Sequence, residues 1–491
     1  MGSFVCTCLH RRFWFWSRSK ECTTSQPRLG HVTHHVEITG QSASDIADSV
    51  RTLIDRGHLR PGDLLPPVRT LARDLGVNRN TTVAAYRLLA TSGLVVGQGR
   101  AGTRVADLSP GPQDGYATDG ADDASAEVVD LASGNPLPAL IPDVRPALTA
   151  AAGHTVLYGE PVIDAGLARW ARDWFAPDVP GAAEAAGAFE LSVTSGAVDA
   201  IERLLAQSLM RDDAVGLEDP CFLASQQTVR LGGYRTVPIA VDERGMTPAG
   251  LRAALEAGVR AVVCTPRAQN PTGASIDAER AQQLREVLAD YPYVLVIEDD
   301  YYSLLSRVPF ESIVGPEHQR WALVRSLSKF IGPDICVALV ASDRETAARL
   351  ALRLSPGTTW VSHLLQRIAL AQLTDASARA LIERAAGVYA DNNAAFVRAL
   401  AERGVDVGVG STGAGAVRAG DGISVWVPVK APATEVAARL ARHGWTVRPG
   451  DEFGLTEDGI ASRHVRVTVH ELSESQVEAF ATDLVLAGGY A

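Results

Sequence analysis

The sequence predicts an α/β protein in which a small helical module precedes a large body built on a mostly parallel sheet. Three observations indicate this class. Apolar residues recur at helical spacing in residues 43–90, continuous apolar runs alternate with helical stretches after residue 130, and a polar stretch separates the two regions. Apolar runs without polar alternation are typical of strands that are buried on both faces of a parallel sheet. With 491 residues, the chain is long enough for at least two domains.

The charge of the chain is divided unevenly. The net charge is −11, but residues 1–40 carry +3 and residues 41–106 carry +4, so residues 107–491 carry −18. A basic N-terminal region joined to an acidic body is typical of a tethered DNA-binding domain. The alternative is a chance fluctuation in charge, which a charge of +4 alone does not exclude. No apolar run is long enough to cross a bilayer, so we expect no membrane partner.

The cysteines and the first residues indicate a cytoplasmic protein. The cysteine spacing fits neither a zinc site nor a disulfide framework, so we expect no metal and six free thiols: Cys6, Cys8, Cys22, Cys221, Cys264 and Cys336. The aromatic run at residues 13–16 lies among arginines and lacks the longer apolar core of a signal peptide. We therefore predict that residues 1–38 are a disordered or spurious N-terminal extension.

Residues 39–106 predict a winged helix-turn-helix. Apolar spacing and stop signals favour three helices: residues 43–57, 68–75 and 79–89. The last two are joined by a short turn at Gly76, and Asn78 supplies a capping side chain for the third. Two short apolar segments then flank the Gly-rich tip at residues 97–102, which is the pattern of a wing.

This module resembles the winged-helix domain of the GntR regulators. The resemblance rests on the stretch from Leu65 to Thr81, although Asn78 stands where the family usually has serine. It implies a double-stranded DNA operator as partner, met by Arg69, Arg79, Asn80, Thr81 and the backbone near Gly102. An arginine fork suits guanine or phosphate, and a helix N-terminus favours phosphate. The alternative is that the helix-turn-helix serves protein contacts.

A linker and a large body follow the module. Residues 107–129 contain no Lys or Arg, and their composition predicts a flexible acidic linker. In residues 130–491, the strand candidates include 261–264, 294–297 and 337–340. Ligands in parallel sheets bind at the carboxyl ends of the strands, so the polar segments that follow these strands are candidate sites.

Lysine is rare in this chain, which makes Lys329 a candidate for chemistry. Only Lys20, Lys329 and Lys430 are lysines among the 46 basic residues. A primary amine forms an imine with an aldehyde, whereas a guanidinium does not. Lys329 follows an apolar run and precedes a Gly-Pro turn. The alternative for a single lysine is an exposed loop residue, so the imine interpretation depends on the motifs around it.

Three further motifs support that interpretation. Ser195-Gly196-Ala197 lies where a strand ends and a helix begins, so its amides suit a phosphate. Asn270 lies in an Asn-Pro-Thr-Gly turn, where it offers a donor to a phenolate oxygen. The carboxylates of residues 298–300 end a buried strand, and such a cluster requires a cation, which a protonated pyridine nitrogen supplies. Together these are the parts of a pyridoxal phosphate (PLP) site.

The order of these motifs resembles the fold-type I PLP-dependent aminotransferases across residues 130–491. The resemblance implies a large, mostly parallel α/β domain and a smaller C-terminal α+β domain. In combination with the N-terminal module, the chain resembles the MocR-type regulators of the GntR family. A homodimer is implied, with each site completed by the partner.

The resemblance also implies roles for individual residues. Lys329 would hold the cofactor, and Asp299, in preference to Asp300, would pair with its ring nitrogen. The other implied cofactor contacts are Tyr301 or Tyr302 and Asn270 at the ring oxygen, Phe222 on the ring, Ser195, Gly196, Ala197, Ser326 and Ser328 at the phosphate, and Tyr158 across the dimer interface. The implied substrate or effector contacts are Arg466, at a carboxylate, and Gly134 and Asn135 in a nearby loop.

One position departs from the family pattern. Relatives usually carry an arginine seven residues after the lysine, where it neutralises the phosphate, but this chain has Cys336. Either Arg325 or another arginine replaces it, or the site binds the cofactor loosely, as would suit a sensor of cofactor level.

Two functions therefore compete. The first is a transcription regulator whose body senses PLP or an amine or amino-acid adduct and controls the winged helix. The second is an active PLP-dependent aminotransferase with an appended DNA-binding domain. We favour the first, without significant turnover, because the fused module requires an operator. A scaffold without cofactor is disfavoured, because the lysine and the carboxylate are both retained.

Overall fold

The computed structural model divides the chain into two compact units, Met1–Asp107 and Leu108–Ala491. It describes the following residues: 37–97, 102–106, 128–153, 155–179, 188–355, 360–405, 420–456 and 459–490. The predicted N-terminal extension lies outside the described residues except at positions 37 and 38, and the predicted linker does so except at positions 128 and 129.

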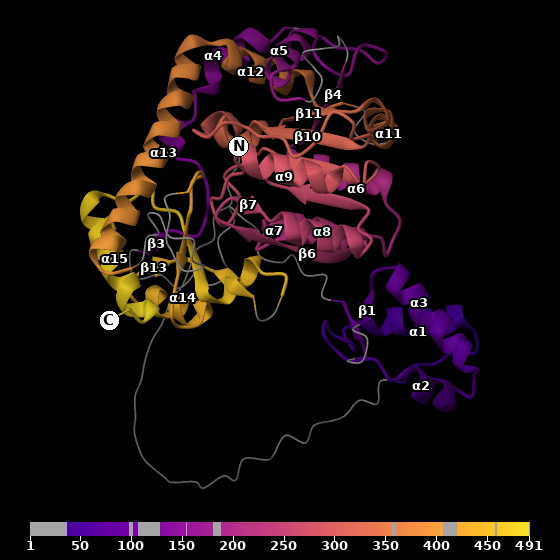
Figure 1. The fold of residues 1–491 in the computed structure, drawn as a ribbon. Helices are drawn as coiled ribbons and strands as arrows, with labels where there is room; N and C mark the ends of the chain where they lie inside the picture. The colour runs from indigo at the N-terminus through magenta and orange to yellow at the C-terminus, as the bar shows by residue number, and fades with distance from the viewer. Residues whose placement is uncertain are drawn as a thin grey trace, which may run out of the picture. The chain divides into compact units, whose positions relative to one another are not determined.

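The described residues of the first unit form three helices and a two-stranded antiparallel sheet (Figure 1). The elements are α1 (Ala43–Asp55), α2 (Val68–Leu75), α3 (Arg79–Thr91), β1 (Val95–Gly97) and β2 (Thr103–Val105). Gly76 ends α2 in a left-handed conformation with a φ of 67°, and the side chain of Asn78 accepts a hydrogen bond from the backbone of Asn80 to cap α3. Ile46, Val50 and Leu89 are buried at the centre of this unit.

An eight-stranded sheet forms the centre of the second unit (Figure 1). Its strands, in spatial order, are β4 (Glu190–Thr194), β11 (Ala338–Ser342), β10 (Trp321–Ser326), β9 (Leu295–Asp299), β8 (Ala261–Cys264), β5 (Ala214–Asp219), β6 (Arg235–Asp242) and β7 (Gly245–Met246). The run from β10 to β6 is parallel, whereas β11 is antiparallel to both of its neighbours and β7 is antiparallel to β6. The prediction of a mostly parallel sheet is therefore confirmed.

Helices cover both faces of this sheet. One apolar cluster packs the sheet against α6 (Ala197–Ser208), α7 (Leu223–Gly232) and α11 (Arg344–Leu354). A second cluster lies on the other face, against α5 (Ala165–Phe175), α8 (Pro248–Glu256), α9 (Ala278–Leu288) and α12 (His363–Thr374). The short helix α4 (Val144–Ala151) packs on α12. Burial of β8, β9 and β10 on both faces explains why their sequences are continuously apolar.

The C-terminal part of the unit is a smaller α+β layer. Its three-stranded antiparallel sheet contains β12 (Val425–Pro428), β15 (His464–Val467) and β14 (Arg448–Pro449). The strands β13 (Trp445–Thr446) and β3 (Val129–Asp130) form a parallel pair, so residues far apart in the sequence lie side by side. The helices are α14 (Ala433–Arg442), α15 (Glu474–Gly488) and the end of α13 (Ala376–Glu402), which also packs on the large domain. In the described part of the chain, no helix has the length and apolar character needed to span a membrane.

Candidate functional site

The end of β9 holds a carboxylate in an unusual environment. Asp299 is only 5% exposed, and no donor among the described residues forms a hydrogen bond with its Oδ1. Burial raises the pKa of Asp299 to about 7, with further contributions from the charges of Asp300 and Glu218. A buried carboxyl oxygen without a donor is costly, and a protonated ring nitrogen is one group that would satisfy it.

The adjacent carboxylate, Asp300, is fully satisfied. It accepts two hydrogen bonds from Arg267, at 2.7 and 2.9 Å, and one from Nε of Arg325 at 2.9 Å. Burial alone would raise its pKa, but the two guanidinium groups hold the pKa of Asp300 below its ordinary value. Of the two neighbouring aspartates, Asp299 therefore has the oxygen that can pair with a ligand.

Arg325 is committed to the core and does not replace the missing phosphate-binding arginine. Its side chain is fully buried, contacts Asp178 and Asp300, and donates to the carbonyl oxygen of Trp174 at 3.0 Å. Its guanidinium also lies 4.8 Å from the ring centre of Trp174 and 4.9 Å from that of Phe175. Of the alternatives that the sequence left open, replacement by Arg325 does not fit the structure, because carboxylates and aromatic rings already surround this side chain.

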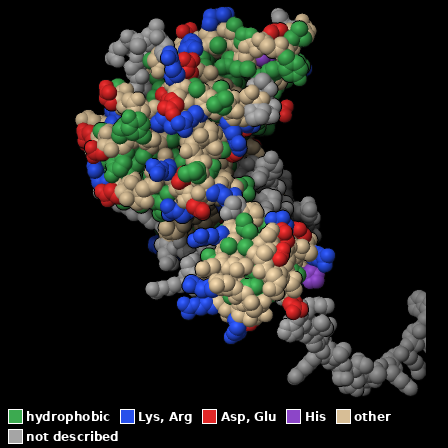
Figure 2. All heavy atoms as spheres, turned by 90° about the vertical axis from the view of Figure 1, so that its right-hand side faces the viewer, with side chains coloured by type: hydrophobic (Ala, Val, Ile, Leu, Met, Phe, Trp, Pro, Cys, Tyr) green, Lys and Arg blue, Asp and Glu red, His purple; other side chains and the backbone are tan. Residues whose placement is uncertain are grey.

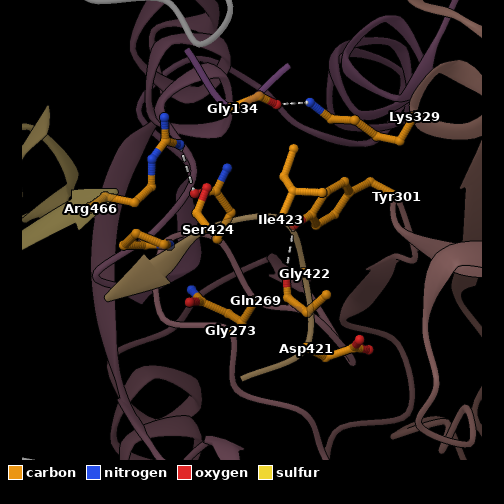
Figure 3. A pocket seen from close by; sticks show the side chains of 13 residues that line it. Gly134, Gln269, Gly273, Tyr301, Lys329, Asp421, Gly422, Ile423, Ser424 and Arg466 are labelled. Atoms are coloured by element: carbon orange, nitrogen blue, oxygen red, sulfur yellow. Dashed lines mark hydrogen bonds between the residues drawn. The ribbon is translucent and has the colours of Figure 1, made fainter. Parts of the chain in front are cut away.

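Lys329 lies at the edge of a pocket. It belongs to α10 (Ser328–Ile331), a single turn that follows β10, and its Nζ donates to the carbonyl oxygen of Gly134 at 2.9 Å (Figure 3). Gly134 adopts a positive φ of 62°, a backbone conformation that favours glycine. The loop that was predicted to lie on the substrate side is therefore in contact with the lysine.

The pocket is built from segments that are distant in the sequence (Figure 3). Its lining residues are Gly134, Ala268, Gln269, Asn270, Pro271, Gly273, Tyr301, Lys329, Asp421, Gly422, Ile423, Ser424 and Arg466. The hydroxyl of Tyr301 donates to the carbonyl oxygen of Ala268 at 2.7 Å. The structure thus brings five of the predicted site residues to one pocket: Gly134, Asn270, Tyr301, Lys329 and Arg466.

Arg466 comes from β15 of the smaller layer and is fully buried. It donates to Oδ1 of Asn270 at 3.1 Å and to the carbonyl oxygen of Ala132 at 2.7 Å, and its guanidinium lies 5.0 Å from the ring centre of Phe453. A guanidinium at the wall of a pocket suits a carboxylate. Arg466 and Asn270, from opposite parts of the body, meet directly at this wall.

The predicted phosphate segment forms the start of α6. Gly196 has a φ of 88° and precedes the helix, and the backbone N–H of Ser195 donates to Oδ2 of Asp199 at 3.0 Å. Cys336 lies beside it, since its Sγ is 3.4 Å from the carbonyl oxygen of Ser195. Ser326 ends β10, where its hydroxyl accepts a hydrogen bond from the backbone of Ser328 at 3.3 Å.

The other predicted site residues differ in their placement. Tyr302 is buried in the core and is not among the residues that line the pocket. Burial raises the pKa of Tyr302 well above its ordinary value. Phe222 is half-buried at the start of α7, and Asn135 is exposed. Tyr158 is 89% exposed and has Trp360 as its aromatic neighbour, with 5.4 Å between ring centres.

Several residues near the site were missed by the sequence analysis. Residues 421–424, just before β12, line the pocket because the backbone N–H of Asp421 donates to the carbonyl oxygen of Gly273 at 3.0 Å. His470, four residues after Arg466, is buried, and burial lowers its pKa to about 4, with a smaller effect from the charge of Lys329. The Gly-rich 420–422 stretch was a signal of close backbone approach, but the sequence does not say to which segment.

The first unit presents the predicted DNA-contact residues on its surface. Arg69 is exposed at the start of α2, and Arg79 and Asn80 are exposed in the first turn of α3. Thr81 and Gly102 are half-buried. Figure 2 shows arginine side chains along one edge of this unit, in the lower part of the view. The N-terminus of a helix together with exposed arginines is a favourable surface for phosphate.

Both units match known families. Residues 126–484 match the family model described as Aminotransferase class I and II, and residues 42–105 match the one described as Bacterial regulatory proteins, gntR family. The chain is 41% identical over 447 residues to the vitamin B6 salvage pathway transcriptional repressor PtsJ of Salmonella typhimurium. The aligned region covers 91% of this chain and 98% of that protein. It is also 27% identical over 321 residues to the HTH-type pyridoxine biosynthesis transcriptional regulator PdxR of Corynebacterium glutamicum. That aligned region covers 63% of this chain and 68% of that protein.

The fold of the body also matches solved structures. The kynurenine aminotransferase of Pyrococcus horikoshii, solved in complex with PMP, aligns with a TM-score of 0.64 and 19% identity, over 74% of this chain and 91% of that chain. At this identity the likeness establishes the fold and not the activity.

Proposed function

We propose a cofactor-sensing function for this chain, which belongs to the MocR-type regulators of the GntR family and joins a winged helix to a body of the aminotransferase class I and II family. It is a transcription regulator, and the GntR module binds DNA. The proposal concerns what the body detects: PLP, or its adduct with an amine or amino acid.

The observation that carries the proposal is the buried Oδ1 of Asp299, which has no donor among the described residues. The family depends on PLP, and this oxygen would pair with the protonated ring nitrogen of that cofactor. Tyr301 and Asn270 would contact the ring oxygen, Phe222 would cover the ring, and Lys329 would hold the cofactor covalently. When bound, PLP supplies an aldehyde that reacts with primary amines.

The remaining site residues would position the phosphate and an effector. The amides of Gly196 and Ala197, with Ser195, Ser326 and Ser328, would line the phosphate. Arg466 would bind the carboxylate of an amino acid, beside the loop of Gly134 and Asn135. The direct contact of Arg466 with Asn270 supports this, because it would link effector binding to a cofactor contact.

We further propose that the protein acts as a cytoplasmic homodimer, in which Tyr158 reaches the site of the partner. Its exposure supports a role at an interface, since a tyrosine with 89% of its surface exposed is free to contact another chain. Two winged helices in one dimer would read paired half-sites on double-stranded DNA.

The test is a titration of the purified chain with PLP, followed by absorbance in the near-ultraviolet and visible range. A saturable new band is expected for the natural chain, and Lys329→Ala should abolish it. A DNA sequence selected from a random double-stranded library should then bind with a different affinity when PLP is added. A chain that gives no band, or whose DNA affinity is the same with and without PLP, would contradict the proposal.

A further inference from the structure

Among the described residues, a carboxylate lies at the start of α6, the segment that is proposed to hold a phosphate. Asp199, in the first turn, accepts the backbone N–H of Ser195 at 3.0 Å, so a carboxylate of the chain itself already uses one amide of this segment. The guanidinium nearest in the sequence, Arg203, is bound to Asp199 at 2.6 Å. The charge of Arg203 is therefore largely neutralised by that carboxylate.

The side of the segment that faces Cys336 is uncharged or acidic. A Cβ added to Gly196 would lie 3.4 Å from Sγ of Cys336, so the thiol occupies the space beside the helix start. Burial, with smaller contributions from the charges of Asp199 and Asp334, raises the pKa of the Cys336 thiol, so the side chain at this position is neutral. Arg325, the other candidate cation, is bound in the core by Asp178 and Asp300.

By contrast, this chain carries the groups proposed for the ring nitrogen and for the aldehyde. Asp299 offers a buried oxygen without a donor among the described residues, and Lys329 lies at the pocket wall. The ring nitrogen and the aldehyde of a vitamin B6 compound would therefore be held well, whereas a phosphate dianion would meet helix amides and hydroxyls beside the carboxylate of Asp199.

From this contrast we propose that the site binds vitamin B6 aldehydes with little preference for the phosphorylated form, so that unphosphorylated pyridoxal is also a ligand. The inference rests on the proposed function and specifies its ligand class. The amine of Lys329 adds to the aldehyde carbon, and water leaves as the C=N bond forms, so no oxidant or reductant takes part. Both compounds supply the same reacting carbon and the same ring nitrogen. In pyridoxal, the 5'-hydroxyl closes a cyclic hemiacetal on that carbon, and this C–O bond opens, with the proton returned to the hydroxyl oxygen, before the amine adds.

The experiment compares the dissociation constants of PLP and pyridoxal, each measured by the absorbance of the C=N bond. For the natural chain, the two constants should lie within about tenfold of each other when pyridoxal is counted as its open-aldehyde form only. Cys336→Arg should tighten PLP about 10- to 100-fold and leave pyridoxal unchanged, because an arginine–phosphate pair is a charge-assisted contact. Cys336 already has a φ of 46° with a side chain, so arginine adds no new backbone strain.

Two controls separate charge at this position from other effects. Cys336→Ser removes the thiol without adding charge and should leave both constants unchanged. Met210→Arg adds the same charge just beyond the other end of α6, about 18 Å away along a 12-residue helix, and should also change neither. Asp199→Asn, which removes a carboxylate, should tighten PLP alone.

The outcomes distinguish this inference from the proposed function. A natural chain that binds PLP more than about 1,000-fold more tightly than pyridoxal would overturn the inference and leave PLP sensing intact. So would Cys336→Arg with unchanged PLP affinity. If neither aldehyde gives the absorbance band, the proposed function fails, and the inference fails with it.

Discussion

At the scale of single residues, environment separates side chains of the same chemistry. Asp299 and Asp300 are neighbours in the sequence, yet burial raises the pKa of the first to about 7, whereas two arginines hold the pKa of the second below its ordinary value. The sequence pointed to a carboxylate cluster at the end of a buried strand. The aspartate that forms ion pairs is the one that Arg267 and Arg325 contact, and only the fold determines which one they contact.

This difference predicts opposite effects for two similar substitutions. Asp300→Asn should lower the free energy of unfolding by about 3–5 kcal/mol, because the guanidinium of Arg267 loses its carboxylate partner and the buried guanidinium of Arg325 keeps only Asp178. Asp299→Asn should leave stability unchanged or slightly increased, and should weaken PLP binding by at least tenfold. Chemical denaturation and PLP titration of both variants measure these effects. Equal loss of stability in the two variants would contradict the assignment.

Glu298 predicts a dependence of stability on pH. Burial raises its pKa to about 7, although the backbone of Ile313 and the hydroxyl of Ser312 donate to it. Since the folded pKa lies above the ordinary value, the folded chain keeps a proton that the unfolded chain loses. The resulting stabilisation is complete below the ordinary pKa of 4.5 and is lost as the pH rises through about 7.

Glu298→Gln should remove this dependence. Relative to the natural chain, the variant should gain up to about 3 kcal/mol in free energy of unfolding between pH 4.5 and pH 8, as the pKa difference implies. Glu317→Gln, the same substitution at an exposed position, serves as the control. Denaturation series at several pH values measure the free energy of unfolding of both variants. If this free energy depends on pH in the same way for Glu298→Gln and for the natural chain, the prediction is wrong.

At the scale of elements, the sequence predicted the strands and helix starts that bear chemistry. Continuous apolar runs identified β8, β9 and β11, and the Ser-Gly-Ala turn identified the start of α6. The antiparallel direction of β11 was not predictable, because an apolar run has no direction. The sequence also did not predict which of Tyr301 and Tyr302 faces the pocket, because successive residues at a strand end point in different directions.

Contacts between distant elements were the least predictable part of the site. Residues 421–424 reach the pocket through Gly273, about 150 residues earlier in the chain, and Arg466 meets Asn270 across the two layers of the body. Such contacts depend on how whole elements pack and leave no local pattern. The family resemblance supplied Arg466 as a candidate, but residues 421–424 and His470 required the structure.

The start of α3 predicts a measurable effect on DNA binding. Arg79→Ala should weaken binding to double-stranded DNA by about tenfold and, if it meets phosphate, reduce the salt dependence by about one counterion. Arg51→Ala, on α1, is the control, because Arg51 is an exposed arginine that lies 3.4 Å from Asp48. Binding at several salt concentrations measures both. Loss of binding in the control alone would place the DNA interface elsewhere.

At the scale of the whole molecule, charge asymmetry and motif order predicted a regulator before any fold was known. The family matches confirm the combination of a GntR module with an aminotransferase-like body. The sequence did not predict how sites and modules are shared between chains, because contacts with a second chain leave no local pattern in the sequence of one chain. The exposure of Tyr158 makes that question testable.

A mixed dimer tests whether each site uses residues from two chains. Tyr158→Ala and Lys329→Ala should each reduce PLP binding when present in both chains. If Tyr158 acts across the interface, a dimer with one substitution in each chain keeps one intact site, and should bind about half the PLP of the natural dimer. Co-expression with two affinity tags isolates it. PLP binding by the mixed dimer as low as that of the two homodimers, each with the same single substitution in both chains, would contradict a site shared between chains.

The most direct measurement is the mapping of the covalent bond between the cofactor and the chain. The natural protein is incubated with PLP, reduced with borohydride, digested and analysed by mass spectrometry. The account predicts a single phosphopyridoxyl label at Lys329, with Lys430 unlabelled. A label at other lysines alone, or no label under conditions that label a known PLP enzyme, would contradict it.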